Sequence, residues 1–164
     1  MTTVDNDNPP AFLAVTQQVD LQRRLREESR QLADGANDLP SLRKLALGEG
    51  GDLESRWRAA IALGKLHDLA AVSNLIDLTN DVAWEMRHSA VWSLCLLADA
   101  AALDRLIAIC SSGKLDEQIN YIAAMGLAAQ FGEQGKRILE ANLQHADASV
   151  RAWARCSLAN VSYR

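Results

Sequence analysis

The chain has 164 residues, of which 49% are hydrophobic and 23% charged, and its formal net charge at pH 7 is -4. This composition fits one soluble domain with a buried core, while the acidic balance argues against nucleic-acid binding, which needs a concentrated patch of Lys and Arg. No apolar run approaches the length of a membrane span, and no basic start leads into an apolar leader. We therefore expect a cytoplasmic protein that binds neither nucleic acid nor membranes.

The amino-terminal part divides into a tail and one predicted helix. Residues 1–15 are polar, include two adjacent prolines, and are typical of a flexible tail. From Thr16 to Ala33 a highly charged segment carries apolar residues at helical spacing, and Gly35 follows its end. The apolar stripe comprises Val15, Val19, Leu25 and Leu32, and Phe12 lies just before it. This thin stripe predicts a helix that caps the first repeat described below, and the alternative is a loosely held arm.

The rest of the chain contains an internal repeat, because four segments align without gaps. They are SRWRAAIALGKL from Ser55, MRHSAVWSLCLL from Met86, INYIAAMGLAAQ from Ile119 and VRAWARCSLANV from Val150. Alanine fills the fifth place and leucine the ninth in every copy, and arginine fills the second place except at Asn120. A second apolar stretch precedes each segment, and Asp and Ser between the two stretches can cap the following helix. Each unit is therefore a predicted helix pair.

These units predict helix pairs at about 39–67, 70–98, 101–131 and 134–161, within a single domain of residues 16–164. The pattern resembles the HEAT-repeat family, and AAIALGKLHD from Ala59 resembles the short repeats of phycobilisome lyase type. The resemblance implies an all-helical, right-handed α-solenoid of about four stacked pairs, an armadillo-type fold. Ankyrin and tetratricopeptide repeats fit less well, because their signature blocks are absent.

The second helix of each predicted pair has two faces of different character. One face centres on the ninth-place leucines and predicts a core that buries Leu63, Leu94, Leu127 and Leu158. The opposite face, at the third, seventh and tenth places, holds no Asp, Glu, Lys or Arg. Its larger side chains, which we call the strip, are Trp57, Ile61, His88, Trp92, Tyr121 and Met125. The alternative is that curvature of the solenoid buries the tryptophans between neighbouring helices.

The strip is the candidate partner-binding site. The resemblance implies that second helices line the concave side of the solenoid, and aromatic residues and Met are enriched at protein interfaces. We predict that the six strip residues receive a helix or an extended peptide of a protein partner. Self-association through the same surface is a further alternative. A rival hypothesis is a bilin-lyase-like enzyme or ligand carrier, which would hold an aromatic small molecule against these rings.

The repeated arginines predict a structural role. Arg56, Arg87 and Arg151 lie at the flank of the second helices, with an aspartate upstream of each. We expect each guanidinium to bond a carboxylate or carbonyl of the adjoining turn and to join the units together. The alternative is that these arginines bind a phosphate or carboxylate ligand.

The sequence predicts no catalytic residue, metal site or cofactor. The three histidines are His67, His88 and His145, and no two have the spacing of a zinc-binding helix. No phosphate-binding glycine loop is present, and the three cysteines are widely spaced without a CxxC motif. We therefore expect a binding module rather than an enzyme.

Overall fold

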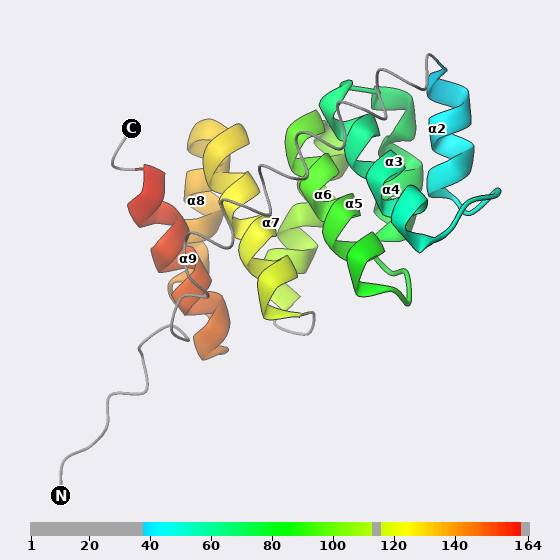
Figure 1. Ribbon diagram of the computed structural model, residues 1–164. Helices are drawn as coiled ribbons and strands as arrows, with labels where there is room; N and C mark the ends of the chain where they lie inside the picture. Colours follow the sequence, from blue (N-terminus) through cyan, green and yellow to red (C-terminus); the bar gives the residue numbers. More distant parts are fainter. Residues whose placement is uncertain (1–37, 113–115, 162–164) are drawn as a thin grey trace, which may run out of the picture.

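The computed structural model describes residues 38–112 and 116–161, and within these ranges every regular element is helical (Figure 1). The first two pairs are α2 (Leu39–Ala46) with α3 (Leu53–Lys65), and α4 (Val72–Leu78), which follows the 3-10 turn η1 (Leu69–Ala71), with α5 (Trp84–Leu97). The last two are α6 (Ala100–Ser112) with α7 (Glu117–Gln130), and α8 (Gly132–Asn142) with α9 (Ala148–Val161). The predicted all-helical fold is confirmed. The predicted tail and capping helix lie outside the described residues.

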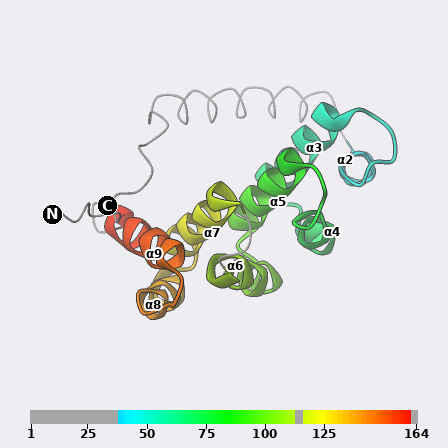
Figure 2. The same ribbon diagram turned by 90° about the horizontal axis from the view of Figure 1, so that it is seen from below.

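The helices form two rows (Figure 2). The first helices of the pairs, α2, α4, α6 and α8, form one row, and the second helices, α3, α5, α7 and α9, form the row on the inner side of the bend. Consecutive second helices contact one another directly, so each pair packs on the next. The pairs therefore build a helical solenoid. Within the described ranges, no helix has both the length and the apolar character needed to cross a bilayer.

Turn aspartates begin the second helices as expected. The Asp52 carboxylate accepts from the backbone N–H of Ser55 at 2.8 Å, and Asp116 accepts from that of Gln118 at 2.9 Å. Asp147 accepts from the backbone N–H of Ser149 at 2.8 Å. Each bond satisfies an amide that would otherwise lack a partner in the first helical turn. The predicted capping role is confirmed for these three turns and is wrong for α5, whose N-cap is Ala83 and has no side-chain cap bond.

The ninth-place leucines form the core, with one exception. Leu63, Leu94 and Leu127 are fully buried. Leu158 is only half-buried, so the prediction that all four are buried is wrong for the last copy. Among the described residues no helix packs on the far side of α9, whereas α3, α5 and α7 each have a following second helix. The missing neighbour leaves part of Leu158 exposed.

Two close contacts between second helices explain why the tenth place of the first two copies holds a small residue, Gly64 or Cys95. A side chain added at Gly64 of α3 would lie 2.7 Å from the Cα of Ser93 in α5, and the Ser93 hydroxyl donates to the carbonyl of Ala60 at 2.8 Å. An added side chain at Gly126 of α7 would likewise overlap Cys95 of α5. The tenth-place residues Gly64 and Cys95 therefore lie at helix contacts and do not belong to the accessible face of the second helices.

Candidate functional site

The strip residues come from three neighbouring second helices and differ in exposure. The half-buried members are Trp57 on α3, His88 and Trp92 on α5, and Tyr121 and Met125 on α7. Ile61 departs from the prediction, since its exposed fraction is 1% and it cannot contact a partner in this conformation. The strip that a partner can reach therefore consists of the five half-buried side chains.

The two tryptophans are anchored on the core and only partly accessible. Trp57 and Trp92 pack against the core, yet each keeps part of its surface accessible. The guanidinium carbon of Arg58 lies 5.5 Å from the centre of the Trp57 ring, within range of a cation–π interaction. Arg58 is itself ion-paired with Glu54 at 2.5 Å, one helical turn earlier. These contacts restrain the Trp57 ring before any partner binds.

The middle of the strip carries a neutral imidazole. The His88 ring lies against that of Trp84, with 4.8 Å between the ring centres. Burial lowers the pKa of His88, and the opposing attraction of Asp116 at the start of α7 is the smaller effect. The histidine is therefore uncharged at neutral pH, which keeps this part of the strip free of formal charge.

Asn160 of α9 contacts the end of the strip on α7. The Asn160 amide nitrogen lies 3.6 Å from the Met125 sulfur. Burial raises the pKa of Tyr121, Cys156 of α9 raises it further, and a hydrogen bond with Asn160 has the opposite effect. Tyr121 and Met125 are thus held by the neighbouring helix, and Cys156 lies half-exposed at the edge of the strip.

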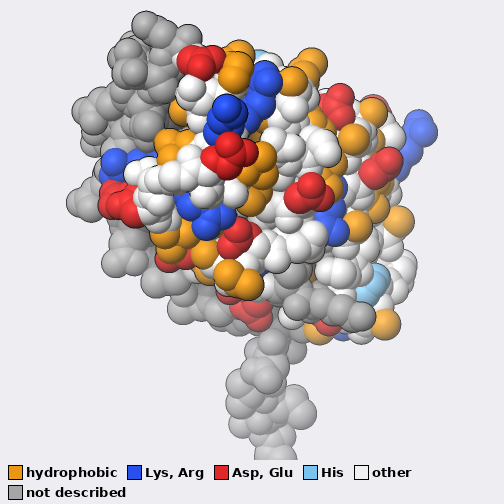
Figure 3. Space-filling model, turned by 90° about the vertical axis from the view of Figure 1, so that its right-hand side faces the viewer, with side chains coloured by type: hydrophobic (Ala, Val, Ile, Leu, Met, Phe, Trp, Pro, Cys, Tyr) orange, Lys and Arg blue, Asp and Glu red, His pale blue; other side chains and the backbone are white. Residues whose placement is uncertain are grey.

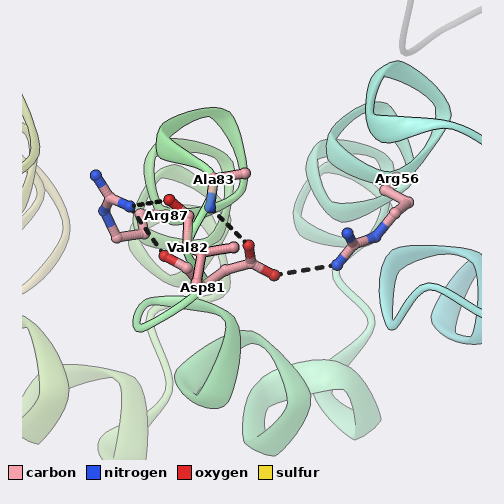
Figure 4. A network of polar contacts seen from close by, with 5 residues as sticks. All are labelled: Arg56, Asp81, Val82, Ala83 and Arg87. Atoms are coloured by element: carbon pink, nitrogen blue, oxygen red, sulfur yellow. Dashed lines mark hydrogen bonds and ion pairs between the residues drawn. The ribbon is translucent and has the colours of Figure 1, made fainter.

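The repeated arginines do not all make the same contact (Figure 4). The Arg56 guanidinium of the first pair bonds the Asp81 carboxylate of the second pair at 3.0 Å. The other oxygen of that carboxylate accepts from the Ala83 backbone N–H at 2.8 Å. Arg87 donates to the carbonyls of Asp81 and Val82, both at 2.9 Å, within its own pair. Arg56 therefore links two units, whereas Arg87 fixes the turn before its own helix.

Arg151 repeats the Arg87 geometry, because it donates to the carbonyls of His145 and Ala146 at 2.7 and 2.8 Å. The structure adds a second arginine–aspartate ion pair, which was not predicted from the sequence. Arg43 of α2 bonds both oxygens of Asp68, at 2.6 and 2.8 Å, and the Asp68 side chain is only 4% exposed. The two residues of each ion pair are 25 positions apart in the chain, and this spacing is the one signal that the sequence contains.

Two of the three cysteines are buried. Burial raises the pKa of Cys95 to about 12 and that of Cys110 to about 11, so both are thiols at neutral pH and poor nucleophiles. Within the described ranges, no three His, Cys, Asp or Glu side chains come together in a way that could hold a metal ion. The strip itself offers aromatic and thioether surface, which binds by apolar contact.

Comparison with known proteins identifies the repeat. Residues 55–81 and 86–112 each match the PBS lyase HEAT-like repeat. The fold is similar to that of human deoxyhypusine hydroxylase in complex with glycerol, with a TM-score of 0.63 and 23% identity, over 77% of this chain and 44% of that enzyme. The chain thus spans less than half of the enzyme's length. No curated protein matches the sequence. Two consecutive units of the chain, α3 to the turn after α4 and α5 to α6, therefore match HEAT-like repeats of the PBS lyase type.

Proposed function

We propose that this protein is a binding module, an adaptor or chaperone-like protein that recognises a partner protein through the strip. The observation that carries the proposal is the half-exposure of Trp57, Trp92 and Tyr121 on three consecutive second helices. Large aromatic side chains are normally well buried in a monomer, and when exposed together they are the residues that anchor protein interfaces.

The surroundings of the strip support recognition of an apolar helix face or an extended peptide. Rings that are already restrained, as Trp57 is by Arg58 and Tyr121 is by Asn160, lose little conformational freedom on binding. The neutral His88 adds no charge that an apolar partner would have to desolvate. The cysteines are free thiols, which supports a reducing compartment such as the cytoplasm.

The test is a titration with an identified partner. The immobilised full chain captures partners from cells, mass spectrometry identifies them, and the purified candidate is titrated against each variant. Trp92→Ala should weaken binding by upwards of about 2 kcal/mol, roughly 30-fold. Leu69→Ala is the matched control, because Leu69 is 60% exposed and lies on η1 beside the other row of helices. Equal binding by wild type and Trp92→Ala would contradict the proposal.

A second candidate is a carrier or lyase for an aromatic small molecule. The match to PBS lyase HEAT-like repeats favours it, and the rings of the strip could stack against such a ligand. The absorbance spectrum of the purified protein separates the candidates. A visible band that Trp92→Ala removes would support the carrier, and a concentration-dependent increase in mass would indicate self-association instead.

A further inference from the structure

The strip has an acidic edge at the amino-terminal ends of its helices. Residues three apart on a helix lie one above the other, so a side chain three places before a strip residue borders that residue. Glu54 therefore borders Trp57 on α3, and Glu85 borders His88 on α5. Glu117 takes the corresponding position in the first turn of α7. All three glutamates are exposed, so each helix that carries the strip presents a carboxylate at its start.

Contacts in the structure join this acidic edge to the rings of the strip. Glu54 pairs with Arg58, whose guanidinium carbon lies 5.5 Å from the centre of the Trp57 ring. The Asp116 carboxylate, directly before α7, is close enough to attract the His88 imidazole of the neighbouring helix α5. The acidic edge and the aromatic surface are therefore continuous on both sides of the contact between helices.

The opposite edge of the strip has a different character. One turn after the seventh place of the repeat, the side chains are Lys65 on α3, Leu96 on α5 and Ala129 on α7. This edge therefore carries a basic residue and two apolar ones, without a carboxylate at these three positions. Charge complementarity thus favours a partner that is basic along one side of its apolar face and uncharged along the other.

We propose that the strip binds a basic amphipathic helix, whose apolar face covers the rings and whose Lys and Arg side chains face Glu54, Glu85 and Glu117. This partner class rests on the proposed function. Consecutive second helices contact one another, and packed helices lie about 8–10 Å apart. Two turns of a partner helix, about seven residues, rise about 10.5 Å and return to the same side. A helix laid across α3, α5 and α7 therefore meets the three carboxylates with a basic residue at every seventh position.

The α2 end of the solenoid is a poorer site for such a helix. The surface at this end shows acidic and basic side chains scattered among hydrophobic ones (Figure 3). The helix α2 has eight residues and is therefore only about 12 Å long. Its buried residues, Leu42 and Ala46, belong to the core. This end lacks the separation of apolar surface and acidic edge that the strip provides.

The test is a titration of the full chain with two synthetic helical peptides of about 20 residues, long enough to cross the three helices. One peptide has a leucine face bordered by Lys at every seventh position, and the matched peptide has Glu at the same positions. Because three exposed charge pairs change sign, the Lys peptide should bind at least about tenfold more tightly, as fluorescence anisotropy measures. Added salt should reduce this preference. Equal affinity of the two peptides, or no binding of the Lys peptide, would overturn the proposal.

Charge variants of the chain locate the preference. Glu85→Gln with Glu117→Gln should weaken binding of the Lys peptide roughly fivefold, because two exposed charge pairs are lost. The control is Glu133→Gln with Glu140→Gln, since both glutamates are exposed on α8 in the other row and Glu133 also lies in a first helical turn. Circular dichroism verifies that both variants are folded. An equal effect of the two variants would place the charge preference away from the strip and overturn the proposal.

The two proposals fail in different ways. Equal affinity for the two peptides, together with loss of partner binding in Trp92→Ala, would remove only the basic partner helix. A captured partner whose binding ignores Trp92→Ala would remove the proposed function, whatever the two peptides do.

Discussion

Each second helix has a core face and an opposite face that carries the strip. The side chains of these two faces differ in how far neighbouring helices bury them. On the core face, Leu63, Leu94 and Leu127 have no exposed surface. On the strip, Trp57, Trp92 and Tyr121 are larger yet only half-buried. Burial of the core face stabilises the solenoid, because each fully buried leucine contributes about 1.5–3 kcal/mol. The solenoid is therefore held together by the leucines of the core face, while the aromatic side chains of the strip stay partly accessible.

The largest expected effect comes from the core face. Leu94→Ala should lower the free energy of unfolding by about 2–5 kcal/mol, through lost transfer energy and a residual cavity. Leu158→Ala should cost only about 1–2 kcal/mol, because Leu158 is half-exposed at the same place of the repeat. Urea unfolding of both variants measures the difference. Equal losses would mean that the end of the solenoid is as tightly covered as its middle.

The second largest loss of unfolding free energy is expected at the contact between α5 and α7. Gly126→Ala should cost about 1–3 kcal/mol, because its methyl group would overlap the Cys95 side chain. Adding Cys95→Ala removes the overlapping sulfur, so the double variant should lose less than the sum of the single losses. Additive losses in urea unfolding would show that the two residues do not limit the approach of the helices.

How far the sequence predicts the structure depends on whether a property is local. The turn caps and the buried Leu63, Leu94 and Leu127 follow from helical spacing and side-chain chemistry, which one segment contains. The exposure of Leu158 and Ile61 was not predictable, because it depends on which neighbours lie beside each helix. The arginines show the same limit, since Arg56 and Arg87 share one repeat place, but Arg56 bonds the Asp81 turn of the next pair and Arg87 bonds the same turn within its own pair.

A smaller effect should come from His88. Burial holds its pKa below the ordinary 6.5, so the folded state binds a proton less tightly than the unfolded state. The contribution of His88 to stability is therefore fully present above about pH 6.5 and is lost as the pH falls below it. His88→Gln should flatten the pH dependence of urea unfolding below pH 6.5, and His67→Asn, in an exposed turn, is the control. An unchanged slope in His88→Gln would contradict burial of the imidazole.

The three cysteines allow buried and accessible positions to be compared by thiol labelling, without a measurement of stability. Cys156, at the edge of the strip, is half-exposed, whereas Cys95 and Cys110 are buried with raised pKa values. A thiol reagent should therefore label Cys156 in the folded protein and the other two only after unfolding. Mass spectrometry of the labelled peptides identifies the site. Labelling of Cys95 as fast as that of Cys156 would show that the contact between α5 and α7 opens readily.

Hydroxyl-radical footprinting of the full chain, free and bound to its captured partner, tests the central claim most directly, because tryptophan, tyrosine and methionine side chains are readily oxidised. The partner should lower the oxidation of Trp57, Trp92, Tyr121 and Met125. Oxidation should not change at Val82, which is 98% exposed in the turn before α5, or at Leu69. Protection of Val82 or Leu69 with unchanged oxidation of the strip would contradict the claim that the strip binds the partner.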